Sequence, residues 1–335
     1  IDAALVGTDI TTFVDEAHLS TALGNTVRTC AQLQRGAPHS PLQRVPRIVA
    51  MSATPPIGLP AESSRLTIGA ADLDHRGAAE RLSAVKRAEL VDLPATPKGK
   101  AVDSLAIALA SRARALAAQG LVVAVVVNTI DAARRTYEEC TRDAQKGEPD
   151  VETKLAIGRC RNIDRDSSRD EWWGKARADR TRELDAAGLV IVATQTIEVG
   201  ADLDVDCLLS EIAPLDALIQ RFGRVNRRRQ QSDLAPVHVF REPNDGQKVY
   251  DALLVQRTLA VLERIQDQAI AESVVSRWLD EIYAGEVETR WRAAFNKATT
   301  DFEAVCLRTL RPFQAAPDLE DLFYRAFDSI EVLPA

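Results

Sequence analysis

Cysteine and histidine are scarce in this sequence, and neither type is clustered. The five cysteines in 335 residues are too far apart to form a CxxC metal or redox pair, and an odd number cannot be fully paired in disulfides. The four histidines are equally dispersed and none precedes an aspartate, which argues against a histidine-aspartate metal centre. We therefore expect a reducing, cytoplasmic setting.

Long apolar runs and an excess of positive charge are also missing. The longest aliphatic run, Leu121 to Val127, is about a third of the roughly 20 residues that span a bilayer. The 42 lysines and arginines are outnumbered by 49 acidic residues, which gives a net charge of −7. This balance argues against a protein that coats nucleic acid through charge alone. We expect no membrane span, and any contact with nucleic acid must be local.

A phosphate-binding loop of the form G-x-x-x-x-G-K-[ST] is absent as well. The two Gly-Lys dipeptides, Gly99-Lys100 and Gly174-Lys175, are each followed by alanine and have no glycine at the required spacing. The chain also begins at Ile1, without an initiator methionine or the basic-then-apolar plan of a signal peptide. We expect the chain to be part of a longer protein.

The organisation of the chain changes at a boundary near residue 97. Its length and 46% hydrophobic content fit about two domains. Two short apolar runs, residues 9–14 and 47–51, stop abruptly at polar residues, as buried parallel strands do at a site. A stretch punctuated by proline and glycine then ends at Lys100, which is typical of an interdomain linker.

Helix and strand patterns alternate from residue 101 onward. The expected helices cover 102–116, which Gly120 can end, 130–145, 176–186 and 215–222, and the expected strands cover 121–127, 153–157, 189–193, 205–209 and 236–240. Such alternation predicts an α/β fold, a parallel sheet with helices on both faces. After about residue 246 the strand patterns stop, and segments 247–271 and 318–329 are typical of amphipathic helices.

An acidic string follows the first expected strand. Asp15-Glu16-Ala17-His18 places two carboxylates and an imidazole at the carboxyl edge of a sheet, where ligands bind in open α/β folds. One acid could hold Mg²⁺ through its water shell while the other deprotonates the attacking water, which suits nucleotide hydrolysis. An acidic pair with a histidine is also a common helix start, so the string alone leaves both interpretations open.

Two further strings follow expected strands. The hydroxyls of Ser52 and Thr54 could link the acidic cluster to a neighbouring lobe, although a Ser/Thr turn before proline is also an ordinary way to leave a sheet. Residues 193–202 leave their strand with hydroxyls and amides that can hold a phosphate backbone. Gly200 there permits close approach of the backbone.

An arginine-rich string begins in the helix expected at 215–222. If that helix continues, Gln220, Arg224 and Arg227 fall at i, i+4 and i+7 and share one face. Two guanidinium groups could then converge on one anionic ligand and neutralise charge on a transferring γ-phosphate. The alternative is a basic, solvated helix face that runs into the arginines at 228–229.

Taken in order, these strings resemble the motifs of superfamily 2 helicases of the DEAH type. The matching strings are Asp15 to His18 for motif II, Ser52 to Thr54 for motif III, Val125 to Thr129 for motif IV, Thr194 to Asp202 for motif V and Gln220 to Arg227 for motif VI. Within that superfamily the chain is most similar to the CRISPR-associated helicase-nuclease of type I systems. Three features carry this likeness: Arg-Val-Asn-Arg at 224–227, the lead-in at 210–216, and the string at 157–166, which also fits a polar surface loop.

The resemblance implies ATP and Mg²⁺ as cofactors and a role for each matching residue. By this resemblance Asp15 would coordinate Mg²⁺ through water and Glu16 would be the general base, while His18, Ser52 and Thr54 would couple hydrolysis to strand movement. Thr129 and Thr194 would contact nucleic acid, and Gly200 and Asp202 would contact the nucleotide. Gln220 would lie near the attacking water, Arg224 and Arg227 would be arginine fingers, and Arg221 would brace the contact between lobes.

The resemblance also implies RecA-like parallel sheets of the P-loop NTPase helicase fold, divided into four segments. Residues 1–70 would be the C-terminal part of a first helicase lobe, 71–100 a linker, 101–245 a complete second lobe and 246–335 a C-terminal helical accessory region. In the family the phosphate loop precedes motif II. We therefore expect the missing helicase segment upstream, and the HD nuclease as a further domain or a separate subunit.

In functional terms, the resemblance implies an ATP-dependent helicase that moves along single-stranded DNA from 3′ to 5′ in type I CRISPR interference. The Cascade surveillance complex would recruit it, and the chain would be inactive alone. Two alternatives remain open: a DEAH-type helicase acting on RNA or on DNA-repair intermediates, and a non-catalytic lobe kept for docking to a partner.

Overall fold

The computed structural model describes part of the chain, which divides into two compact units. One unit comprises Ile1–Ser64 with Gly285–Ala335, and the other comprises Arg65–Ala284. The described residues are 11–15, 17, 47–51, 70–82, 84–93, 101–142, 151–158, 172–178, 180, 188–198, 202–227, 235–241, 249–265, 269–270, 272–290 and 293. Among them, no helix combines the length and apolar character needed to cross a membrane.

The first unit contains a pair of parallel strands. Strands β1 (Thr11–Val14) and β2 (Arg47–Ala50) pair in register over their full length. Beyond the strand ends, the N–H of Met51 donates to the carbonyl of Val14 at 2.8 Å, and the N–H of Ala17 donates to the carbonyl of Met51 at 3.0 Å. The two strands predicted at 9–14 and 47–51 are confirmed, and the segments that follow them start side by side.

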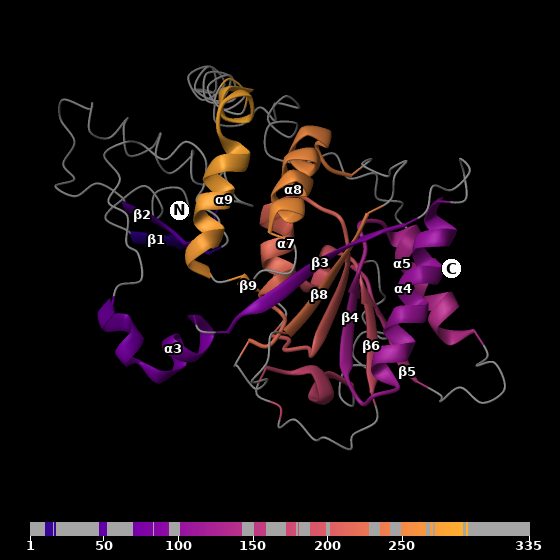
Figure 1. Cartoon of the computed structure of the whole chain (residues 1–335). Helices are drawn as coiled ribbons and strands as arrows, with labels where there is room; N and C mark the ends of the chain where they lie inside the picture. Colours follow the sequence, from indigo (N-terminus) through magenta and orange to yellow (C-terminus); the bar gives the residue numbers. More distant parts are fainter. Residues whose placement is uncertain are drawn as a thin grey trace, which may run out of the picture. The chain divides into compact units, whose positions relative to one another are not determined.

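The second unit is built on a seven-stranded sheet (Figure 1). The strand order is β5-β6-β4-β7-β8-β3-β9, and all neighbours are parallel except β9, which is antiparallel to β3. The strands are β3 (Lys86–Asp92), β4 (Val122–Val126), β5 (Glu152–Ala156), β6 (Leu189–Ala193), β7 (Cys207–Glu211), β8 (Ala235–Arg241) and β9 (Ala269–Ile270). The predicted parallel sheet is confirmed.

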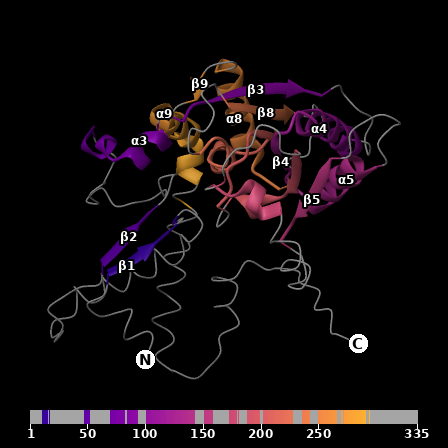
Figure 2. The same ribbon diagram turned by 90° about the horizontal axis from the view of Figure 1, so that it is seen from below.

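Helices cover both faces of this sheet. The helices are η1 (Ala70–Asp74), α3 (Arg76–Leu82), α4 (Ala101–Ala117), α5 (Ile130–Thr141), η2 (Gln195–Ile197), α7 (Leu215–Phe222), α8 (Ala252–Arg264) and α9 (Glu272–Tyr283). The crossovers through α4 and α5 run toward the β5 edge, whereas the crossover through α7 runs the opposite way. Because such crossovers are right-handed, α4 and α5 lie on one face and α7 on the other, where α8 packs on it (Figures 1 and 2).

The central strands are buried along their whole length. Every residue of β4 and β6 is at most 5% exposed, as expected for apolar strands covered on both faces. On the α4 side, Leu105 and Leu109 of the helix pack with Val123 and Val125 of β4. The unbroken apolar runs seen in the sequence therefore mark the middle of the sheet.

Two glycines meet specific geometric demands around the end of α4. Gly120 has a φ of 82° and its N–H donates to the carbonyl of Ala117 at 2.9 Å, so it ends the helix as predicted. Gly188 enters β6 against the same turn, where an added Cβ would lie 1.9 Å from the carbonyl oxygen of Ala117. Only glycine fits at position 188.

Four sequence predictions differ from the structure. Residues 86–92, within the expected linker, form β3, which pairs with β8 over its full length and buries Ala88. The strand expected at 205–209 begins at Cys207. Of the helix expected at 176–186, only Ala176 is helical, at the end of a turn over 172–176, because Arg177 bridges to Leu203; residues 179 and 181–187 lie outside the described residues. Strands do not stop at 246, since β9 follows α8; the helix expected at 318–329 lies outside the described part of the chain.

Candidate functional site

Three neighbouring strands of the second unit end in polar side chains. Strand β4 runs out to Asn128 and Thr129, β6 to Thr194 and Gln195, and β7 ends at Glu211. The chain changes direction across the sheet at β4, because α5 leads toward β5 whereas α7 leads toward β8. In open α/β folds, ligands bind outside the carboxyl ends of the strands at such a switch point. This edge is the candidate site.

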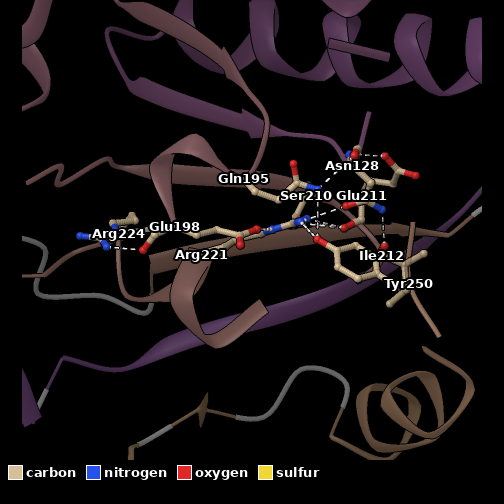
Figure 3. A network of polar contacts seen from close by, with 9 residues as sticks. All are labelled: Asn128, Gln195, Glu198, Ser210, Glu211, Ile212, Arg221, Arg224 and Tyr250. Carbon is tan, nitrogen blue, oxygen red and sulfur yellow. Dashed lines mark hydrogen bonds and ion pairs between the residues drawn. The ribbon is translucent and has the colours of Figure 1, made fainter. Parts of the chain in front are cut away.

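Arg221 lies at the centre of the site and its side chain is fully buried. Each of its five N–H groups has an acceptor (Figure 3): the Glu198 carboxylate at 2.8 Å, the Ser210 hydroxyl at 2.9 Å, the Glu211 carbonyl at 3.1 Å, the Asn128 side-chain oxygen at 2.9 Å and the Tyr250 hydroxyl at 3.2 Å. A buried guanidinium requires a paired charge and satisfied donors. Arg221 meets both conditions.

A second set of hydrogen bonds ties the strand ends to one another. The N–H of Asn128 donates to the Glu211 carboxylate at 2.7 Å, and its side-chain amide donates to the Ile212 carbonyl at 2.8 Å. The Gln195 amide donates to the Asn128 carbonyl at 3.0 Å and to the Tyr250 hydroxyl at 3.2 Å. The ends of β4, β6 and β7 therefore form one polar network with Arg221.

Burial controls the protonation of two members of this network. Burial raises the pKa of Glu198 above its usual range, and the guanidinium of Arg221 opposes that rise. Burial also raises the pKa of the Tyr250 phenol. The Tyr250 hydroxyl therefore stays neutral at physiological pH and can accept hydrogen bonds without carrying charge.

The arginines of the expected motif VI do not share one helix face, so that prediction is wrong. Helix α7 ends at Phe222, and Gly223 caps it. Beyond the cap, Val225 bridges to Val205 and Asn226 has a φ of 47°. These contacts draw the chain to the sheet before another helical turn can form, and Arg224 and Arg227 leave from a turn.

Both arginines nevertheless reach the segment expected as motif V. The guanidinium of Arg224, a residue only 9% exposed, donates to the backbone carbonyl of Glu198. Arg227 forms an ion pair with Asp202 at 2.5 Å, and its backbone N–H donates to the Asp204 carboxylate at 2.7 Å. Both arginines therefore contact this segment from a turn instead of from one helix face.

The place of Arg221 also differs from the expected one. The sequence predicts that it braces a contact between lobes, but all five of its donors are taken by groups of the second unit. Its guanidinium sits beneath α7, where it holds α7 to β7 and to Glu198. Arg221 therefore stabilises the packing within the second unit.

The other predicted site residues are placed as follows. The Thr129 hydroxyl caps α5 by accepting from the Ala132 N–H at 3.1 Å, and Thr194 is buried at the end of β6. Gln220 is half-buried in α7, and Asp15 is exposed just after β1. Glu16, His18, Ser52, Thr54 and Gly200 lie outside the described residues.

Sequence reasoning missed several members of the network. Glu198 and Gln195 lie inside the string at 193–202, and Ser210 and Glu211 lie inside the lead-in at 210–216, so the strings themselves gave a signal. Tyr250 gave none, because it belongs to no motif and lies within the segment 247–271, which is typical only of an amphipathic helix.

The described residues provide partial support for a nucleotide and its metal. They contain no group of three or more histidine, cysteine or acidic side chains able to hold a metal ion. Asp15 offers a carboxylate just after β1, the type of oxygen ligand that Mg²⁺ takes. Arg224 and Arg227 supply guanidinium groups, which suit phosphate oxygens.

A family model described as "CRISPR-associated nuclease/helicase Cas3, C-terminal" matches residues 119–230. These residues run from the end of α4 past α7 and contain Arg221, Arg224 and Arg227. This segment belongs to the Cas3 family. The resemblance drawn from the sequence motifs is confirmed, and this segment corresponds to the C-terminal part of Cas3 helicases.

Curated Cas3 proteins are similar to a larger part of the chain. The "Putative CRISPR-associated nuclease/helicase Cas3" of Myxococcus xanthus is 31% identical over 229 residues, which cover 66% of this chain and 28% of that protein. The "CRISPR-associated helicase Cas3" of Thermoproteus tenax is 29% identical over 199 residues, or 56% of this chain and 31% of the relative. The chain thus spans less than a third of either Cas3 relative.

Solved Cas3 structures share the fold. The crystal structure of T. fusca Cas3-AMPPNP superposes with a TM-score of 0.62 at 20% sequence identity, covering 96% of this chain and 40% of that one. Together with the mostly parallel sheet, this likeness confirms the predicted RecA-like α/β helicase fold. The limits of the individual domains stay a prediction.

Proposed function

We propose that this chain is part of an ATP-dependent motor that moves along single-stranded DNA in type I CRISPR interference. In this proposal the first unit contributes the end of one RecA-like lobe, and the second unit contributes the other lobe with its accessory helices. The chain alone hydrolyses no ATP, because its sequence contains no G-x-x-x-x-G-K-[ST] loop to hold the triphosphate.

One observation carries the proposal: two arginines of the expected motif VI form a hydrogen bond and an ion pair with residues of the expected motif V. Arg224 donates to the Glu198 carbonyl and Arg227 pairs with Asp202. Phosphate oxygens are anionic, so a hydrogen bond from Arg224 to a γ-phosphate is stronger than its bond to a neutral carbonyl. Exchange of the carbonyl for the phosphate therefore supplies a guanidinium where charge develops during hydrolysis.

The remaining roles in ATP hydrolysis follow from residue chemistry. Asp15, with Mg²⁺ bound through water, and Glu16, as general base, would act from the end of β1. A bound Mg²⁺ would neutralise part of the negative charge on the phosphates. Gln220 would orient the attacking water, and Asp202 and Gly200 would face the nucleotide. His18, Ser52 and Thr54 would couple hydrolysis to strand movement.

Contact with single-stranded DNA is proposed for the carboxyl edge of the sheet. The Thr129 hydroxyl accepts from the Ala132 N–H, and a hydroxyl that accepts one bond still has a hydrogen to donate to a phosphate. Thr194 is only 5% exposed, so its contact requires a small opening of the β6 end. Backbone contacts of this kind position a strand without selecting a sequence.

Recruitment by Cascade is proposed from a structural neighbour. A chain in the solved "CRISPR RNA-guided surveillance complex, pre-nicking" has a TM-score of 0.56 to this one at 18% identity, covering 87% of this chain. The shared fold alone assigns no partner, and the Cas3 family of residues 119–230 supports the assignment. The HD nuclease would act from a further domain or subunit.

The test is ATP hydrolysis by this chain and by a protein extended upstream of Ile1 to include a phosphate loop. The extended protein is expected to hydrolyse ATP when single-stranded DNA is added, whereas this chain is not. Glu16→Gln and Arg224→Ala should each abolish the activity. Arg76→Ala is the matched control, since Arg76 pairs with Glu80 of its own helix and its side chain is 92% exposed.

Three results would contradict the proposal. Hydrolysis that survives both Glu16→Gln and Arg224→Ala would remove the catalytic assignment. Stimulation by RNA in preference to single-stranded DNA would favour the DEAH-type RNA helicase. Binding to a partner that is indifferent to Arg224 and Arg227, without ATP hydrolysis by the extended protein, would favour the docking lobe.

A further inference from the structure

Tyr250 occupies a place in the Arg221 network that no motif explains. Its hydroxyl oxygen accepts one N–H from Arg221 and one from Gln195, both at 3.2 Å (Figure 3). Arg221 lies in α7 and Gln195 begins η2. One phenol oxygen therefore joins the two segments expected as motifs V and VI. Tyr250 lies outside the residues that the Cas3 family model matches.

The start of α8 fixes the position of this tyrosine. The Asp251 carboxylate accepts from the N–H groups of Leu253 and Leu254 at 2.9 and 3.4 Å, which caps the helix directly after Tyr250. One turn further along α8, the buried Thr258 hydroxyl accepts the Leu215 N–H at 3.0 Å. Helix α8 is thus anchored to the first residue of α7 as well as to Arg221.

The contacts of Glu198 connect Tyr250 to the expected arginine finger. The Glu198 carboxylate accepts from Arg221 at 2.8 Å, and the Glu198 carbonyl accepts from Arg224. Without the Tyr250 oxygen, Arg221 has four acceptors for five N–H groups, and Gln195 loses one of its two. A fully buried guanidinium cannot turn to water for the missing bond. It has to shift, and Glu198 shifts with it.

We infer that Tyr250 is a positioning residue for ATP hydrolysis, which through Arg221 and Glu198 sets the place from which Arg224 reaches the phosphate. The inference rests on the proposed function. Tyr250 touches no reacting atom in this scheme and acts only through the buried network. Through Tyr250, which directly precedes the N-cap of α8, the accessory helix would contribute to ATP hydrolysis, although no sequence motif indicates such a role.

The test compares two tyrosines in the upstream-extended protein. Tyr250→Phe removes the shared acceptor, and Tyr137→Phe removes a hydroxyl from α5, on the opposite face of the sheet. Steady-state ATPase with single-stranded DNA is measured well below the unfolding temperature of each variant. Tyr250→Phe is expected to lower kcat about tenfold while KM for ATP stays within about twofold, because Arg224 acts mainly in the transition state. Tyr137→Phe should leave kcat unchanged.

A second comparison tests the shared route. Gln195→Met removes the other donor to Tyr250, so the double variant with Tyr250→Phe should lower kcat no further than the stronger single variant. If the kcat losses of the two single variants multiply in the double variant, Tyr250 and Gln195 do not act through the same network. A kcat for Tyr250→Phe within about twofold of wild type would overturn the inference. An extended wild type without ATPase would instead refute the proposed function, and the inference with it.

Discussion

Glu198 and Arg221 form an ion pair at 2.8 Å with 13% and 0% of their side chains exposed. Removing two charges from water is costly, and only further hydrogen bonds make such a pair stable. Arg221 makes four of them, to β7, to the end of β4 and to Tyr250. The pair therefore links the expected motif V to motif VI inside one lobe.

Arg221→Met is expected to destabilise the chain strongly. The substitution leaves the buried Glu198 carboxylate without its cation, and breaking a buried pair on one side costs about 3–5 kcal/mol. The measurement is the free energy of unfolding in urea. Arg264→Met is the control, because Arg264 pairs with Glu281 on the surface and should change stability little. Equal losses for both variants would contradict the role given to Arg221.

The buried His238 is expected to make the folded protein less stable as the pH falls. Burial lowers the pKa of His238 below its usual 6.5, and Glu89, at 2.8 Å, opposes this. The unfolded chain therefore binds the proton first, so stability present above pH 6.5 is lost as the pH falls. Unfolding in urea between about pH 7.5 and 5.5 measures the slope. His238→Gln should flatten it, and an unchanged slope would contradict the prediction.

Gly188→Ala is expected to destabilise the second unit. The new Cβ would lie 1.9 Å from the Ala117 carbonyl oxygen, so α4 and β6 must separate, and overpacking of this kind costs about 1–3 kcal/mol or more. Gly174→Ala is the matched control, because nothing lies within 4 Å of its added Cβ. Thermal unfolding of both variants measures the difference. A Gly188→Ala variant as stable as Gly174→Ala would rule out this close approach.

Thr258→Val should loosen α8 from α7. The valine keeps the shape but removes the oxygen that accepts the Leu215 N–H at 3.0 Å, and an unsatisfied buried donor costs about 1–3 kcal/mol. Hydrogen exchange at the Leu215 amide is expected to accelerate. Thr141→Val provides the comparison, since the Thr141 hydroxyl is exposed and donates to carbonyls of its own helix. Unchanged exchange at Leu215 would contradict the anchor.

Regular elements of the second unit were predictable from local patterns. The apolar runs at 121–127 and 189–193 became β4 and β6, because a strand buried on both faces needs nothing but apolar side chains. Gly120 ended α4 as expected, because its positive φ is accessible to glycine at no cost. Strand β3 was missed, because four of its seven residues are charged, as in an exposed segment.

The sequence predicted which segments form the candidate site, but it predicted the positions of the individual side chains less well. The order of the motif strings identified the Cas3 family, which the match over 119–230 confirms. Helical spacing predicted one face for Gln220, Arg224 and Arg227, but Gly223 ends the helix before that spacing applies. The two arginines approach motif V through a turn, which periodicity cannot describe.

By itself, the sequence determined the family, the α/β class and the strings that carry chemistry, because these depend on residue type and local order. Tertiary structure alone decided the partners of Arg221 and the place of Tyr250. Five acceptors for one guanidinium come from four separate segments of the chain, and only the folded sheet brings them within 3.2 Å. Burial then makes each of those contacts necessary, because no water replaces a missing one.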